Sequence, residues 1–208
     1  MQEADKLCHQ GRKKRMNERS QTDGRPGAEV TLSSEMKYSG KIITLQVDQV
    51  RLPSGATASR EIVRHPGAAA VICIVDGKLL TVGQYRKPMD KYQVEIPAGK
   101  LDPGEDPAVC AARELKEETG VSASSMRLVD AFYTSPGFAD EKLYLYVAEG
   151  LEHGASSPDE DEDLHVEALT MEQALSYIEQ GLIGDAKTLM AVYLWRLSEL
   201  TGRIGLRG

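Results

Sequence analysis

The stretch "GKLDPGEDPAVCAARELKEETGV", residues Gly99–Val121, decides the fold, and it contains an apparent fault. Among its six carboxylates, Glu114, Glu117 and Glu118 follow an i, i+3, i+4 spacing. Residues at this spacing share one face of a helix, where like charges repel by roughly 0.2–0.5 kcal/mol per exposed pair. A sequence that keeps three such charges together therefore needs a compensating interaction.

The same stretch carries clear signals for the two ends of a helix. Asp106 suits the N-cap, Pro107 the first helical position, and Gly120 the position just past the end. The face opposite the three glutamates is apolar and small. It comprises Ala108, Ala111, Ala112 and Leu115. We expect this face to pack closely against a sheet, with the acids on the far side.

Two further details favour a metal-binding role over a solvated charged face. Glu117 and Glu118 occupy the last turn, the end of the helix dipole that disfavours acids. The preceding loop, "PAGKLDPGE" (97–105), is rich in Gly and Pro, which allow backbone carbonyls to approach a ligand. Clustered oxygen donors fit Mg²⁺ or Mn²⁺, and Mg²⁺ commonly binds through a few carboxylates plus substrate phosphates. The residues thus indicate metal-assisted chemistry on a phosphate compound.

Length and composition set the limits for the rest of the chain. The 208 residues suit one domain with an appendage, and 41% hydrophobic and 27% charged residues are ordinary for a globular protein. A net charge of −7 gives no footprint for nucleic acid, and no apolar run is long enough to span a membrane. Three cysteines without a C-x-x-C pair suggest neither disulfides nor a zinc site, which favours a reducing compartment, the cytoplasm.

Hydrophobic periodicity predicts strands and helices in mixed order, typical of an α+β fold in which a sheet packs between helices. Asp76-Gly77 is a type I′ hairpin signal. A Thr170…Gln173 capping box opens a second helix, and a third has a broad apolar face. The predicted strands are 41–52, 59–65, 67–75, 78–86, 92–99, 126–134, 142–149 and 164–169, and the predicted helices 106–119, 170–181 and 185–200.

The opening stretch resembles the Nudix box, G-x5-E-x7-R-E-U-x-E-E-x-G-U, where U is bulky and apolar. All nine constrained positions match: Gly99, Glu105, Arg113, Glu114, Leu115, Glu117, Glu118, Gly120 and Val121. The resemblance implies an α/β/α sandwich with a mixed central sheet. It also implies hydrolysis of a nucleoside diphosphate linked to another group.

The resemblance assigns roles to residues of the box. Glu114, Glu117 and Glu118 match metal ligands, helped by a backbone carbonyl near Ala98. Glu105 either joins the metal site or pairs with Arg113. For Arg113 we favour the role of an ion-pair partner that orients the glutamates. The implied cofactor is Mg²⁺, with Mn²⁺ as the alternative, at two or three ions per site.

Other segments narrow the resemblance to the ADP-ribose pyrophosphatase subfamily. "YTSPGFADE" follows the box, with Pro136 sixteen positions after Gly120, and the likeness extends through "SREIVRHPGA", "QYRKP", "EIPAGK" and "DEDEDLHVE". It implies hydrolysis of ADP-ribose to AMP and ribose 5-phosphate. Five substrate contacts besides Pro136 are then expected: Arg60 and Arg86 on the diphosphate and sugar, Tyr38 on adenine, and Gly137 and Phe138 in the pocket wall.

The acidic run Asp159–Asp163 would otherwise be read as a solvated loop. In this subfamily a mobile acidic loop supplies the base that activates water, and Glu160 matches that position best. Glu162 is the second candidate, or an additional metal ligand. A base on a loop is physically sensible because the loop closes only after substrate and metal have neutralised the site.

The predicted organisation has three parts. Residues 1–30 form a disordered leader, residues 31–65 an antiparallel β region, and residues 66–208 the Nudix hydrolase domain. The resemblance implies a homodimer in which the N-terminal strands cross to the partner, so that Arg60 serves the other subunit's site. No nucleic acid or membrane partner is expected.

Two alternatives stay open at this point. The enzyme could act on another nucleoside diphosphate derivative: a sugar nucleotide, a dinucleoside polyphosphate or a flavin nucleotide. A non-catalytic transcriptional sensor of the same fold is disfavoured, because the box is intact and the short remainder after Leu200 holds no winged-helix module.

Overall fold

The computed structural model describes residues 25–154 and 164–202. The chain divides into two compact units. One comprises Met1–Glu35 with Asp48–Arg60, and the other Met36–Val47 with Glu61–Gly208.

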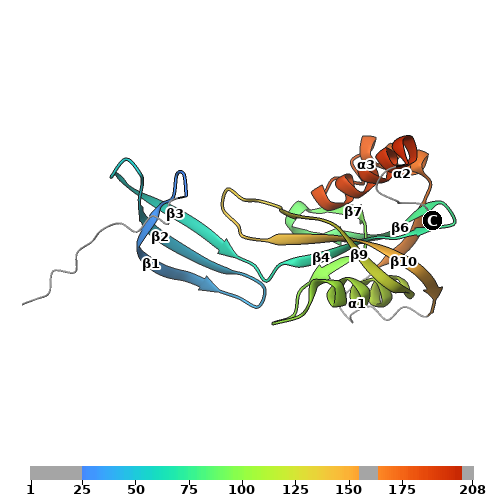
Figure 1. Cartoon of the computed structure of the whole chain (residues 1–208), viewed down its shortest axis with the longest axis horizontal. Coiled ribbons are helices and arrows are strands. Elements are labelled where there is room, and N and C mark those ends of the chain that lie inside the picture. Colours follow the sequence, from blue (N-terminus) through green and yellow to red (C-terminus); the bar gives the residue numbers. More distant parts are fainter. Residues whose placement is uncertain (1–24, 155–163, 203–208) are drawn as a thin grey trace, which may run out of the picture. The chain divides into compact units, whose positions relative to one another are not determined.

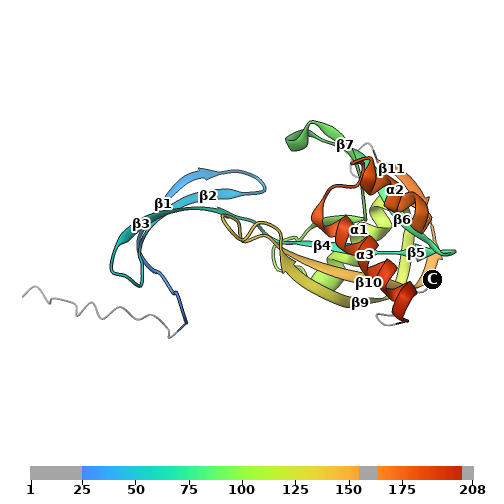
Figure 2. The ribbon, with the colours of Figure 1, turned by 90° about the horizontal axis from the view of Figure 1, so that it is seen from above.

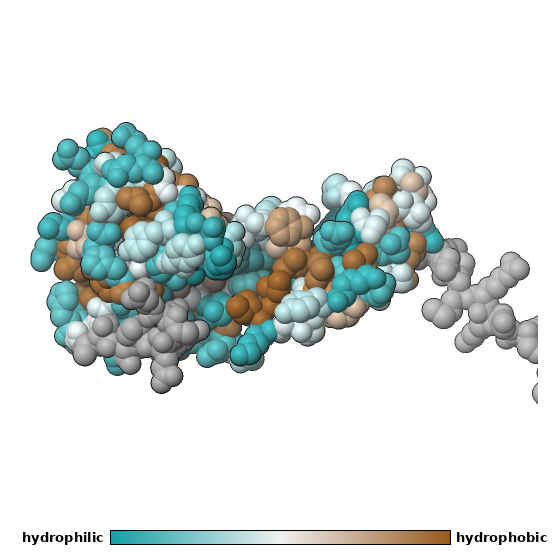
Figure 3. Space-filling view, turned by 180° about the vertical axis from the view of Figure 1, so that it is seen from behind, coloured by the Kyte–Doolittle hydropathy of each residue, from teal (hydrophilic) through white to brown (hydrophobic). Residues whose placement is uncertain are grey.

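The N-terminal strands form a three-stranded sheet in the order β1-β2-β3. β2 (Thr44–Arg51) and β3 (Thr57–Arg64) confirm the strands predicted there. β1 (Val30–Ser39) falls within the predicted β region 31–65, but hydrophobic periodicity did not identify it as a separate strand. Its alternation is interrupted by Ser34, so the apolar pattern is weak. Its apolar side chains are exposed, Leu32 at 44% and Met36 at 57%. Figure 3 shows hydrophobic residues reaching the surface of the N-terminal strands.

The larger unit contains two four-stranded sheets. In the first, of order β8-β4-β10-β9, β10 runs parallel to β4 and antiparallel to β9, which confirms a mixed sheet. The second has the order β11-β6-β5, with β7 also paired to β6. The strands are β4 (Ala68–Ile72), β5 (Ile74–Val75), β6 (Lys78–Arg86), β7 (Lys91–Glu95), β8 (Ala98–Lys100), β9 (Val121–Tyr133), β10 (Lys142–His153) and β11 (His165–Leu169).

The predicted hairpin and helix ends are present. Asp76 and Gly77 have φ values of 50° and 73°, as a type I′ turn requires. The Asp106 side chain accepts a hydrogen bond from the Ala108 N–H at 2.8 Å, and Gly120 is left-handed at φ 74°. The three α-helices of the described chain are α1 (Pro107–Thr119), α2 (Met171–Glu179, opened by the Thr170 capping box) and α3 (Ala186–Thr201).

Helices cover both faces of the sheet, with α1 on one side and α2 and α3 on the other (Figures 1 and 2). Strand β4 shows why. Ala70 and Ile72 pack in the core beneath α2 and α3, whereas Ala69 and Val71 pack in the core beneath α1. A strand buried on both faces reads as a continuous apolar run, as "AAAVICIV" does.

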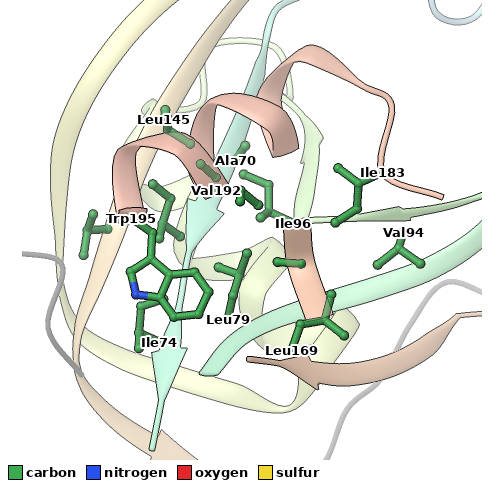
Figure 4. Close-up of a cluster of buried hydrophobic side chains, with 14 of the residues drawn as sticks. Ala70, Ile74, Leu79, Val94, Ile96, Leu145, Leu169, Ile183, Val192 and Trp195 are labelled. Carbon is green, nitrogen blue, oxygen red and sulfur yellow. The ribbon is translucent and has the colours of Figure 1, made fainter. Parts of the chain in front are cut away.

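The core on the α3 side is the larger of the two. Its packing sets the position of the N-terminal end of α3. Trp195 and Val192 of α3 lie over Leu145, Leu79 and Ala70 (Figure 4). Trp195 is only 2% exposed. This packing brings the N-terminal end of α3 to the cleft described below. None of the helices in the described part of the chain has the length and apolar character needed to cross a bilayer.

Candidate active site

A cleft of about 1100 Å³ opens in the larger unit. The ends of several elements line it: Arg86 at the end of β6, the short helix η1 (Lys87–Met89), strand β8, one face of α1 and the first turn of α3. One wall therefore carries the glutamates of the box, and another carries Arg86 and Lys187.

The three box glutamates all line this cleft, as the helical spacing predicts. Glu118 is the most buried, at 3% exposed, and its carboxylate accepts the Ala98 N–H at 3.1 Å. Leu115 and Ala111 anchor the other face of α1 in the core with no exposed surface. The apolar face thus positions the helix, while the acidic face supplies oxygen atoms to the cleft.

Arg113 forms ion pairs with three carboxylates of the box. Its guanidinium donates to both oxygens of Glu105 at 3.0 Å, to Glu114 at 2.7 Å and to Glu117 at 3.0 Å. The Asp102 N–H also donates to Glu105, and together with Arg113 it lowers the Glu105 pKa to about 2. Of the two roles left open for Glu105, the structure shows the ion pair.

The donor set fits a hard divalent cation, since Glu114, Glu117 and Glu118 bring carboxylate oxygens to one cleft. In the structure these carboxylates are engaged by Arg113 and by the backbone. In the described segments, no three His, Cys, Asp or Glu side chains are already arranged to hold a metal ion.

The backbone at Gly99 lies very close to the Glu114 carboxylate. A Cβ atom at this position would lie 1.8 Å from Oε1 of Glu114 and 1.9 Å from its Cδ. Only a glycine leaves room for the carboxylate where it now lies. The first position of the box is therefore a steric requirement of a proposed metal ligand.

Gly99→Ala should displace the Glu114 carboxylate without disrupting the core, because the clash involves the end of a flexible side chain. Since small misplacements in an active site cost up to about 100-fold, we expect turnover to fall by about 10- to 100-fold. Steady-state kinetics and thermal unfolding of the variant check this. Glu172→Gln, an exposed position on α2 outside the cleft, is the control and should behave as the wild type. An active Gly99→Ala enzyme would contradict the steric account.

Arg86 lines the cleft, as expected, and forms a bidentate ion pair with Glu95, both N···O distances being 2.7 Å. Glu95 is buried at 2% exposed. Burial alone would raise the Glu95 pKa, but Arg86 and Lys187 outweigh it and lower the pKa to about 2. Arg86 therefore keeps an ionised partner at neutral pH.

The sequence reasoning did not identify three residues around Arg86: Asp185 and Lys187, which line the cleft, and the buried Glu95. Lys187 bonds Glu95 and lies 2.9 Å from Asp185. A signal existed for Glu95, since an acid inside the apolar strand "YQVEIPAG" requires a buried partner. Nothing in the sequence identifies Lys187 as that partner, because 92 positions separate the two residues.

Four other predicted substrate contacts do not line the cleft. Pro136, Gly137 and Phe138 form an exposed turn, and the adjacent Thr134 and Ser135 line the cleft instead. Tyr38 is 57% exposed on β1 and does not line the cleft.

The predicted substrate contact Arg60 does not line the cleft of the described structure, and the two candidate bases are not part of that structure. Arg60 belongs to the smaller unit, where its Nε donates to Glu29 at 3.0 Å. Glu160 and Glu162 lie outside the described residues, as does most of the predicted leader.

Comparison with known families gives two matches. Residues 63–191 match the NUDIX domain, and residues 29–63 match the nucleoside diphosphate sugar hydrolase N-terminal domain. Together these two regions span nearly all of the described chain.

Individual relatives agree with these matches. The chain is 52% identical to the methanol dehydrogenase activator of Bacillus methanolicus and 47% identical to the ADP-ribose pyrophosphatase of Bacillus subtilis (strain 168). Each alignment spans 174 residues, 82% of this chain and 94% of the relative. The crystal structure of an ADP compounds hydrolase matches with a TM-score of 0.74 and 23% identity, covering 85% of this chain and 97% of that one. At that identity the structural match shows the fold.

Proposed function

The chain belongs to the NUDIX family, and from this we propose that it hydrolyses the diphosphate bond of ADP-ribose to AMP and ribose 5-phosphate. One observation carries the proposal: a single cleft holds the three box glutamates on one wall and Arg86 on another. Such a cleft suits a diphosphate lying between bound cations and a guanidinium. The 47% identity to an ADP-ribose pyrophosphatase over 94% of its length supports ADP-ribose as the substrate.

Nudix hydrolases use divalent cations, generally Mg²⁺. Here Glu114, Glu117 and Glu118 would hold them, with the Ala98 carbonyl as a further oxygen donor and two or three ions per site. When bound, such ions polarise phosphoryl oxygens and lower the pKa of water. Arg113 orients Glu114 and Glu117, while Arg86 holds a diphosphate oxygen through its planar fork.

We assign the role of general base to Glu160, with Glu162 as the second candidate. Glu160→Gln should lower kcat by about 100-fold while KM changes little, because a general base acts in the chemical step and not in binding. Steady-state kinetics of both glutamine variants distinguish the two residues. A loss confined to Glu162→Gln would transfer the role to that residue.

A homodimer with shared sites completes the proposal. The exposed apolar residues of β1 support it, since an exposed edge strand with apolar side chains favours pairing with another chain. In such a dimer Arg60 and Tyr38 would serve the partner's cleft. Mixing inactive Arg60→Ala and Glu118→Gln subunits would then restore some activity by placing one intact site in each mixed dimer. No restoration, with mixed dimers present, would contradict shared sites.

The first alternative substrate class is a sugar nucleotide, which the match to the nucleoside diphosphate sugar hydrolase N-terminal domain favours. A panel decides between the classes: ADP-ribose, a sugar nucleotide, a dinucleoside polyphosphate and a flavin nucleotide, each with Mg²⁺. We expect the highest kcat/KM for ADP-ribose. A tenfold preference for any other member would overturn the assignment.

A second candidate function follows from the 52% identity to a methanol dehydrogenase activator. Activation of an alcohol dehydrogenase would be a further role of the same hydrolase. The rate of a methanol dehydrogenase, measured with the wild-type protein and with Glu118→Gln, tests it. Stimulation by the wild type alone would favour this candidate.

A further inference from the structure

The guanidinium of Arg86 is held on one side and open on the other. Glu95 uses two of its five N–H donors, and 38% of the Arg86 side chain remains exposed, in the cleft wall. Arg86 sits at the end of β6, directly before the turn of η1. Its orientation therefore depends on the carboxylate of Glu95.

Glu95 in turn depends on a second cation. Glu95 is only 2% exposed, and a buried carboxylate is costly unless it is paired and hydrogen-bonded. Arg86 binds both of its oxygens, and Lys187 Nζ binds Oε2 from the first turn of α3. Lys187 is itself 12% exposed and lines the cleft.

The start of α3 is fixed to the strand that carries Glu95. The Ile96 N–H donates to Thr188 Oγ1 at 3.0 Å, and the Asp185 side chain caps α3 by accepting the Thr188 N–H at 3.1 Å. Asp185 also binds Lys187 at 2.9 Å. Lys187 is thus held on two sides, so its ammonium can fix Glu95 in one position.

We propose that Lys187 and Glu95 are positioning residues that hold Arg86 in its diphosphate-binding orientation. Lys187 acts through Glu95 and not by its own contact with substrate. The proposal rests on the proposed function, because it takes the diphosphate as the group that Arg86 binds.

A double-mutant cycle between Arg86→Met and Lys187→Met tests the proposal. Its two readouts are KM and kcat for ADP-ribose with Mg²⁺, and the Kd for ADP measured calorimetrically in EDTA. Lys187→Met alone should raise KM and Kd by about 10-fold while kcat changes less. In the Arg86→Met background the same change should have almost no further effect. Lys187→Arg should recover most of the affinity, because it keeps the charge.

Additive effects in the two backgrounds would overturn the proposal, since Lys187 would then act without Arg86. So would a fall in kcat alone. Lys78→Met, an exposed lysine on β6 outside the cleft, is the matched control and should match the wild type. If Lys187→Met does not fold, Lys187→Gln and Glu95→Gln each complete a cycle with Arg86→Met.

The measured Kd for ADP tests this inference independently of the proposed function, because ADP binding does not require hydrolysis of ADP-ribose. A wild-type protein that binds ADP but leaves ADP-ribose intact would refute the proposed substrate, and the cycle would still be decided by the ADP affinities. An active wild type with an additive cycle would refute the inference alone.

Discussion

Glu118→Gln is expected to lower kcat by at least about 100-fold while leaving the protein folded. Glu118 lines the cleft and is 3% exposed, so the substitution removes charge at a buried position and keeps the shape of the side chain. The amide oxygen of Gln can still accept the Ala98 N–H, now at 3.1 Å from the carboxylate, which preserves the local backbone. A neutral amide is a poor ligand for a hard divalent cation, and cation-assisted phosphoryl chemistry depends on several kcal/mol of charge stabilisation.

The measurement is kcat for ADP-ribose over a titration of Mg²⁺, with thermal unfolding followed in parallel. Glu172→Gln is the matched control, because Glu172 is an exposed helical glutamate outside the cleft. We expect the control to behave as the wild type. Unchanged kcat in Glu118→Gln at every Mg²⁺ concentration would remove Glu118 from the proposed metal site.

The second large effect concerns stability at acid pH. The Glu95 pKa is lowered from 4.5 to about 2: burial opposes the shift, and hydrogen bonds and charge from Arg86 and Lys187 outweigh it. Since the folded pKa is the lower one, Glu95 stabilises the fold above about pH 4.5, and this contribution is lost as pH falls toward 2. A shift of this size corresponds to about 3 kcal/mol.

Glu95→Gln should therefore be less stable than the wild type by about 3 kcal/mol at pH 7, and the difference should narrow as the pH falls toward 2. Urea unfolding of both proteins at several pH values between 3 and 7 measures it. The Glu172→Gln control should stay within about 0.5 kcal/mol of the wild type throughout. A difference between Glu95→Gln and wild type that is independent of pH would show that ionisation of Glu95 does not stabilise the fold.

Local signals predicted most of the elements of the larger unit. The caps at Asp106, Gly120 and Thr170 and the turn at Asp76 each depend on chemistry within a few residues, and each is present. Strand β1 lies in the predicted β region 31–65, but periodicity did not delimit it, because Ser34 interrupts its apolar alternation and its side chains are exposed on both faces. A strand without a buried face leaves little pattern to read.

The acidic wall of the cleft was also predictable, because Glu114, Glu117 and Glu118 lie on one helix with fixed spacing. Of the basic wall, Arg86 was predicted and Lys187 was not. Arg86 was identified by resemblance, but its link to Lys187 joins positions that only the tertiary fold brings together. Pairings of this kind depend on the packing of α3 against the sheet, which no local pattern specifies.

Product analysis tests the central claim most directly. Purified protein incubated with ADP-ribose and Mg²⁺ should release AMP and ribose 5-phosphate in equal amounts, and an excess of EDTA should stop the reaction. Chromatography of the products against both standards measures this. Absence of AMP, or its release at an undiminished rate in EDTA, would contradict divalent-cation-dependent hydrolysis of ADP-ribose in this cleft.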